Sequence, residues 1–190
     1  IAIHQKSSFP RWELLGINAG CMVGDPGLIV LADAYLKGIR DYDVNKAYDI
    51  SKASSDCEET LWGEPFHSIR PHCEAYIENA FVPEKLSDTL EYLMADYTMY
   101  KFALAMGREE DAERYKSRFE RYAENYNTEL GFMAPRYSNG EFVYEENEYD
   151  DDGCVESNIF QQNWFIPYDV KGLSELMGNE RTLSLLERFF

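Results

Sequence analysis

A dense group of polar and aromatic side chains begins at Glu156. Residues 141–156 contain eight carboxylates and no lysine or arginine, and Glu156 ends this stretch. Residues 157–169 are then rich in amides and aromatic rings, among them Asn158, Gln161 and Trp164. Amides and carboxylates hydrogen-bond hydroxyl groups, while aromatic rings pack on apolar faces. This combination predicts a cleft that binds sugars, with a buried amphipathic segment as the structural alternative.

Glu156 is the candidate for proton transfer within this group. A carboxyl group that packs against aromatic rings is held away from water, and its pKa can then rise into the range of a general acid. Glu156 directly precedes a run that contains Phe160 and Trp164. We therefore predict that Glu156 donates a proton, with the amides of Asn158 and Gln161 beside it.

A second cluster lies near the beginning of the chain. Trp12 is followed by a glycine-rich loop, residues 20–24, and then by Asp25 and Pro26. A carboxylate at the end of such a loop can lie at the rim of a helical barrel and contact a ligand. The structural alternative is that Asp25 caps a helix whose first residue is Pro26.

The apolar spacing predicts helices that must position these residues. Steps of three and four residues indicate helices over 27–39, 44–59, 84–106 and 109–126, with shorter ones over 170–177 and from 179 onward. The turn between the two longest helices is short, which predicts an antiparallel helical hairpin. Asn139-Gly140 predicts a small β-hairpin, and residues 61–71 are predicted to be loop. The expected fold is mainly α-helical, either an α/α toroid or an α-solenoid.

Composition excludes several classes of function. The chain has 190 residues, enough for one ordinary domain, and a net charge of −17. Such a surface repels nucleic acid and anionic membranes, so we expect neither as a partner. The aromatic content of 15% argues against disorder. The four cysteines form no CxxC pair, which argues against a structural zinc site and leaves one or two disulfides open.

The sequence contains no complete metal-binding or repeat motif. Glu148, Asp150 and Asp152 fit the first, third and fifth positions of an EF-hand, but Ile159 then occupies the position that requires glutamate. His67 and His72 lie in a proline-containing loop and share no helical face. The helical hairpin around residues 107–113 is similar to a tetratricopeptide unit, but no repeat follows. No metal ligands are therefore assigned, and a scaffold remains a minor alternative.

Both ends of the chain suggest a longer protein. The first residue is Ile1 rather than methionine, and Phe189-Phe190 ends the sequence inside a helical pattern. We expect residues 1–190 to be a single fragment of one domain, truncated at both ends.

Several segments together resemble one family. In order along the chain, they resemble motifs of glycoside hydrolase family 92, the calcium-dependent exo-acting α-mannosidases. These are residues 10–14 (PRWEL), 20–24 (GCMVG) with 32–39 (ADAYLKGI), 87–92 (SDTLEY) with Asp96, 131–136 (GFMAPR) and 156–170 (ESNIFQQNWFIPYDV).

The resemblance implies a fold and a reaction. It implies part of an (α/α)₆ barrel that acts on mannose-containing glycans, with α-1,2-linked mannosides expected, and inverts the sugar's configuration. Glu156 matches the family's general acid, while the general base and most ligands of the calcium cofactor are expected beyond Phe190. A secreted, periplasmic or cell-surface location is also implied. The residues expected to line the mannose pocket are Trp12, Asp25, Arg136, Asn158 and Gln161.

The chain departs from the family pattern at several positions near the candidate acid. Phe160 replaces the usual tryptophan, Gln162 the usual tyrosine and Ser157 a small glycine or alanine, whereas Glu156 is retained. These changes put leaving-group specificity and the level of activity in doubt. Two alternatives therefore remain: another (α/α)-barrel glycosidase or lyase, and a non-catalytic helical module that binds carbohydrate or serves as a scaffold.

Overall fold

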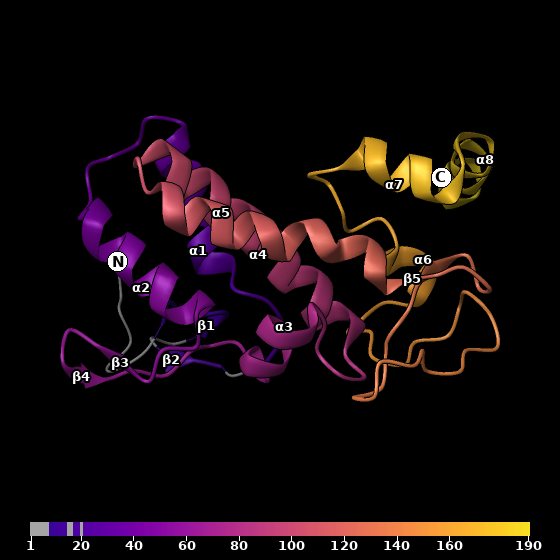
Figure 1. Ribbon diagram of the computed structural model, residues 1–190, viewed down its shortest axis with the longest axis horizontal. Helices are drawn as coiled ribbons and strands as arrows, with labels where there is room; N and C mark the ends of the chain where they lie inside the picture. The colour runs from indigo at the N-terminus through magenta and orange to yellow at the C-terminus, as the bar shows by residue number, and fades with distance from the viewer. Residues whose placement is uncertain (1–7, 15–16, 20) are drawn as a thin grey trace.

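The computed structural model describes residues 8–14, 17–19 and 21–190, and this part of the chain is mainly helical (Figure 1). The helices are α1 (Pro26–Leu36), α2 (Val44–Ser55), α3 (Cys73–Asn79), α4 (Leu86–Ala105), α5 (Glu109–Phe119), the 3₁₀ helix η1 (Glu120–Asn125), α6 (Ile159–Gln162), α7 (Val170–Met177) and α8 (Asn179–Phe189). Three small antiparallel sheets pair β1 (Glu13–Leu14) with β2 (Ile17–Asn18), β3 (Thr60–Leu61) with β4 (Glu64–Pro65), and β5 (Tyr126–Asn127) with β6 (Phe132–Met133).

The long helix α4 is the centre of the packing. It returns through Gly107, whose φ of +71° suits a glycine, into α5, and the two helices run side by side in Figure 1. The predicted helical hairpin is thereby confirmed. The half of α4 near Phe102 packs with α1, α2 and α5 around Tyr48 and Tyr115, whereas the half near Leu90 packs with the C-terminal segments around Phe132 and Ile159. α4 therefore joins two apolar clusters.

Three predictions from the sequence need correction. Residues 61–71 are not all loop, because β3 and β4 form a hairpin there, and α3 follows it. The predicted helix over 109–126 changes at Phe119 into the 3₁₀ helix η1. The turn at Asn139-Gly140 is present, with Tyr137 N–H donating to Glu141 O at 2.8 Å, but only an isolated bridge between Arg136 and Phe142 accompanies it.

One disulfide ties the end of α2 to the start of α3. Cys57 and Cys73 are bonded, with their Cα atoms 6.0 Å apart and a sequence separation of 16 residues. Cys21 is an exposed free thiol and Cys154 a half-buried one. The bond therefore closes the β3–β4 segment into a covalent loop.

None of the described helices is both long enough and apolar enough to cross a membrane.

Candidate functional site

The first turn of α4 fixes the loop that carries Glu156. The first N–H groups of a helix have no partner within the helix. Here the Ser87 N–H donates to Gly153 O at 3.1 Å, and the Ser87 hydroxyl accepts the Val155 N–H at 2.9 Å. Glu84 N–H also donates to Arg136 O at 2.8 Å. The start of α4 thus holds the backbone of both the 153–155 loop and Arg136.

Glu156 lies on a strained turn with its side chain exposed. Its φ of +53° falls in the left-handed region, which is costly for residues other than glycine. The expectation that its carboxyl packs against the following rings is not met, because the side chain is exposed. Phe160 instead belongs to the apolar core, with its ring centroid 6.0 Å from that of Phe132 and 6.4 Å from that of Trp164. The rings serve packing, and the carboxyl is free to meet a ligand.

Asn158 and Gln161 form a capping box at the start of α6. The Gln161 N–H donates to Asn158 Oδ1 at 3.0 Å, and the Asn158 N–H donates to Gln161 Oε1 at 3.2 Å. Next to this box, Gln162 Nε2 donates to Ser157 Oγ at 2.7 Å, and that hydroxyl donates to Val155 O at 3.1 Å. The polar side chains that follow Glu156 therefore fix the backbone of its turn.

Asp25 is buried in an ion-pair cluster rather than acting as a helix cap. As the structural alternative predicted, it stands at the N-cap position of α1 and Pro26 is the first helical residue, but its side chain makes no capping hydrogen bond. Arg70 Nε lies 3.4 Å from Asp25 Oδ2, and its Nη1 lies 2.8 Å from Asp96 Oδ1, with all three side chains at most 1% exposed. Ser54 Oγ also donates to Asp25 Oδ2 at 2.9 Å.

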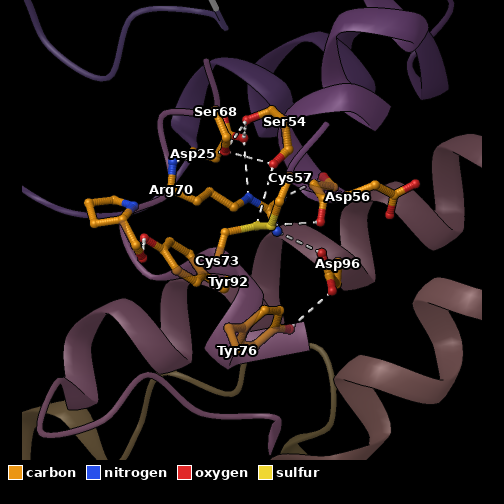
Figure 2. The surroundings of a disulfide bond; sticks show 12 residues. Asp25, Ser54, Asp56, Cys57, Ser68, Arg70, Cys73, Tyr76, Tyr92 and Asp96 are labelled. Atoms are coloured by element: carbon orange, nitrogen blue, oxygen red, sulfur yellow. Dashed lines mark hydrogen bonds and ion pairs between the residues drawn. A yellow bond between two sulfur atoms is a disulfide. The ribbon is translucent and has the colours of Figure 1, made fainter. Parts of the chain in front are cut away.

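Figure 2 shows how this cluster is built around Arg70. Its Nη2 donates to Ser55 Oγ at 2.7 Å, and the Tyr76 hydroxyl donates to Asp96 Oδ2 at 3.1 Å. Burial alone lowers the pKa of Arg70, but Asp96 and Asp25 outweigh this effect and raise it above its ordinary value. The guanidinium therefore stays charged and connects α1, α2 and α4 beside the disulfide.

Among the described residues, the side chains of Trp12 and Arg136 make no hydrogen bond or ion pair with this cluster. The Trp12 side chain is 49% exposed, at the start of the β1–β2 hairpin. Arg136 donates from Nε to Gly140 O at 2.8 Å, and its guanidinium lies 4.7 Å from the ring centroid of Phe81. Among the described residues, neither side chain has a recorded hydrogen bond or ion pair with Glu156. Arg136 thus has a structural task in the 136–142 turn, while Trp12 offers an open ring face.

Sequence reasoning missed the buried Arg70 and the half-buried Glu91. Arg70 stands alone in a proline-containing loop, and Glu91 lies among the apolar residues of α4. The signal for Glu91 was present in the sequence, since a carboxylate inside an apolar helical pattern needs a reason to be buried. Arg70 has no such signal, because its partners Asp25 and Asp96 are distant in sequence.

The described residues do not fit a calcium site. Nowhere in the part of the chain that the structure describes do three or more His, Cys, Asp or Glu side chains come together to hold a metal ion. The acidic stretch 145–152 is accordingly not an assembled ligand set.

The comparison with protein families decides the classification. The profile of the glycosyl hydrolase family 92 catalytic domain matches residues 1–190. The chain belongs to glycosyl hydrolase family 92. The resemblance inferred from the separate sequence motifs is thereby confirmed.

Solved structures of family 92 match this fold closely. The family GH92 alpha-mannosidase BT3965 of Bacteroides thetaiotaomicron matches with a TM-score of 0.85 and 26% identity, covering 96% of this chain and 24% of that protein. The inverting mannosidase BT2199 of the same organism matches with a TM-score of 0.86 and 28% identity, covering 96% and 25%. A curated relative, an uncharacterized secreted glycosidase of Arthroderma benhamiae, is 23% identical in an alignment of 185 positions that covers 79% of this chain and 24% of that protein. This chain spans about a quarter of each relative.

Proposed function

We propose that the protein containing this chain is an exo-acting α-mannosidase that inverts configuration, with Glu156 as its general acid. The carrying observation is that the whole chain matches a family 92 catalytic domain and superimposes on an inverting mannosidase of that family. A related mannosidase structure holds mannoimidazole, which supports a mannoside as the substrate class. We propose α-1,2-linked mannosides as the first substrates to test.

The proposed chemistry needs two carboxyl groups. Glu156, in its protonated form, donates its proton to the glycosidic oxygen as the bond from that oxygen to the anomeric carbon breaks. A water molecule attacks the anomeric carbon from the opposite face, and a second carboxylate accepts its proton. In inverting glycosidases the two carboxyl groups are about 6.5–9.5 Å apart, which leaves room for this water. We place the second carboxylate in the part of the family 92 domain that this chain does not span.

The geometry of the Glu156 turn supports its role. The carboxyl is exposed while its backbone is held by Ser87 and by the capping box of Asn158 and Gln161. An acid must reach the leaving oxygen and must also be held in place, because small misplacements reduce the rate. Both conditions are met by an exposed side chain on a fixed turn.

The other proposed pocket residues have different support. Trp12 presents an open ring that can stack on a sugar. Asp25 has one carboxylate oxygen, Oδ1, without a hydrogen-bond partner among the described residues, and it is buried at the end of a loop. Arg136, Asn158 and Gln161 already make structural hydrogen bonds, so we propose that they shape the pocket and contact mannose only through groups still available.

Architecture, location and calcium follow as proposals from the family. We propose that residues 1–190 form part of an (α/α)₆ barrel that is completed by further segments, which would also hold calcium. The disulfide supports an oxidising location, because such bonds persist in secreted and periplasmic proteins. The secreted relative agrees with that assignment.

The test measures mannose release from α-1,2-mannobiose by the full-length parent, with calcium and with a chelator. Glu156→Gln keeps the size of the side chain but removes the acid, so we expect turnover to fall by about 10²–10⁴-fold. Glu146→Gln is the matched control, because Glu146 is an exposed glutamate of the same acidic stretch. Proton NMR during the first minutes identifies the anomer released, which is β-mannose for inversion.

The outcomes separate the alternatives. A loss below about tenfold for Glu156→Gln, with Glu146→Gln unchanged, refutes the general-acid role. Release of glucose or a uronic acid from other glycosides, with no release of mannose, identifies a different (α/α)-barrel glycosidase or lyase. Sugar binding without any turnover in the folded parent identifies a carbohydrate-binding module.

A further inference from the structure

A half-buried carboxyl group, that of Glu91, lies on α4 between the two candidate loops. Glu91 follows Ser87 by four residues, and side chains at that spacing lie on the same helical face. Ser87 holds the backbone of Val155, next to Glu156. Glu91 therefore occupies the following turn of the helix face that positions the proposed acid.

The loop before α1 rests directly on Glu91. A Cβ atom placed on Gly24 would lie 2.5 Å from Glu91 Oε2 and 3.2 Å from Glu91 Cβ, so a larger residue there would displace the Glu91 side chain. Gly24 also has a φ of +83°, and Met22 has a φ of +65°. The backbone of this loop is therefore strained at Met22, and its course brings Gly24 into contact with Glu91.

Arg11 holds the same loop by donating hydrogen bonds to the loop's backbone carbonyl groups. Its Nε donates to Gly24 O at 3.0 Å, and its Nη1 donates to Met22 O at 2.7 Å. The loop between these carbonyls ends at Asp25, which is fixed in the Arg70 cluster. The backbone of residues 22–25 is therefore held by Arg11, by Glu91 and by the ion pair of Asp25.

We propose that Glu91 is a positioning residue of the glycan site, whose neutral carboxyl seats the 22–25 loop against α4 and whose ionisation loosens it. This inference rests on the proposed function, because the loop carries Asp25 and is held by Arg11, the residue next to Trp12. The loop and the Glu156 turn would then share one support, α4, in a fixed relation to each other.

The charges around Glu91 give the direction of the effect. Burial, followed by the negative charge of Asp88, raises the pKa of Glu91 from 4.5 to about 7, while Arg11 lowers it. Asp88 lies on α4 and Arg11 on the segment before β1, and these are the charged groups that act on Glu91 among the described residues. Because the folded pKa is raised, the seated loop is favoured at low pH and loses stability as the pH rises from about 4.5 through about 7.

Hydrogen exchange of the full-length parent tests the proposal without any need for activity. The reporter is the peptide covering residues 22–30, where the Ile29 N–H donates to Asp25 O. If opening the loop returns Glu91 to its ordinary pKa, protection corrected for intrinsic exchange falls about tenfold between about pH 6 and pH 8. In Glu91→Gln the fall should be absent, whereas the exposed control Glu74→Gln should keep it.

A second variant, Asp88→Asn, tests the proposal independently in case Glu91→Gln does not fold. Asp88→Asn removes the charge that raises the pKa of Glu91, so the midpoint of the wild-type fall should move to lower pH. A fall that persists in Glu91→Gln, or a midpoint that Asp88→Asn leaves in place, overturns the proposal. Mannobiose hydrolysis is measured in parallel. A pH-dependent loop in a parent without mannosidase activity would refute the proposed function and leave the role of Glu91 in seating the loop intact.

Discussion

Removal of the disulfide between Cys57 and Cys73 gives the most direct test of how this fold is held. The bond closes a loop with a sequence separation of 16 residues between α2 and α3. Loop-closure entropy for that length gives about 3 kcal/mol of stabilisation at 25 °C, chiefly by restricting the unfolded chain. We therefore expect Cys57→Ala/Cys73→Ala to weaken the segment that contains β3, β4 and Arg70 by about that amount.

The assay is hydrogen exchange in the full-length parent, since a large protein is not expected to unfold in one step. The reporter is the Phe66 N–H, which donates to Glu59 O at 2.8 Å across the β3–β4 hairpin. A loss of about 3 kcal/mol corresponds to about 10²-fold faster exchange where local opening limits the rate. The segment that covers residues 57–73 should therefore exchange much faster, while α5 should change little.

The control is Cys21→Ala, because Cys21 is an exposed free thiol and its removal breaks no bond. Exchange over residues 57–73 that rises less than about threefold would refute the reasoning. That result would mean that the Arg70 ion pairs alone hold the loop closed. The double variant should also lose activity, because Arg70 orients Asp25 through a contact that the loop must deliver.

Two further predictions follow from close packing and from charge. Gly153→Ala should lower stability by more than about 1 kcal/mol and should also lower mannose release, because the new Cβ would lie 2.7 Å from Glu84 O at a φ of +72°. The control is Gly38→Ala, which has a φ of +87° and open space around it and therefore suffers only the backbone strain. Equal effects of the two variants in thermal unfolding would contradict this reasoning. Burial, followed by Asp152 and Asp150, raises the pKa of Glu145 from 4.5 to about 7. Stability linked to Glu145 is therefore present at low pH and lost as the pH rises from about 4.5 through about 7, so Glu145→Gln should raise the unfolding temperature at about pH 8 and change it little at about pH 5.

Local patterns in the sequence predicted most of the longer helices and some short ones. The predicted helix over residues 170–177 is observed with those bounds, and Asp169 caps it by accepting the Gly172 N–H at 2.9 Å. The spacing of apolar residues carries that information directly. By contrast, α3 was missed because it has only seven residues and is flanked by two cap residues with positive φ, His72 and Ala80. Its position depends on the disulfide, which the sequence did not decide.

The candidate site was only partly predictable from the sequence, because contacts between residues far apart in the chain leave no local pattern. Glu156 was singled out from its neighbours, and its local backbone is indeed distinctive. Asn158 and Gln161, three residues apart, were interpreted as sugar ligands, although that spacing also fits a capping box, which the structure shows. Arg70 pairs with Asp25 and Asp96 across 45 and 26 residues of sequence. Periodicity within a helix gives no information about such long-range pairs.

The exposure of Glu156 has a consequence for where the rest of the site must come from. A general acid gains from being shielded from water, because shielding favours the neutral form that donates the proton. In this chain the neighbouring rings of Phe160 and Trp164 pack with the core and leave the carboxyl exposed. The shielding groups must therefore be supplied by other segments of the parent or by the bound sugar. Activity should consequently require the full-length parent, even though this chain alone contains the proposed acid.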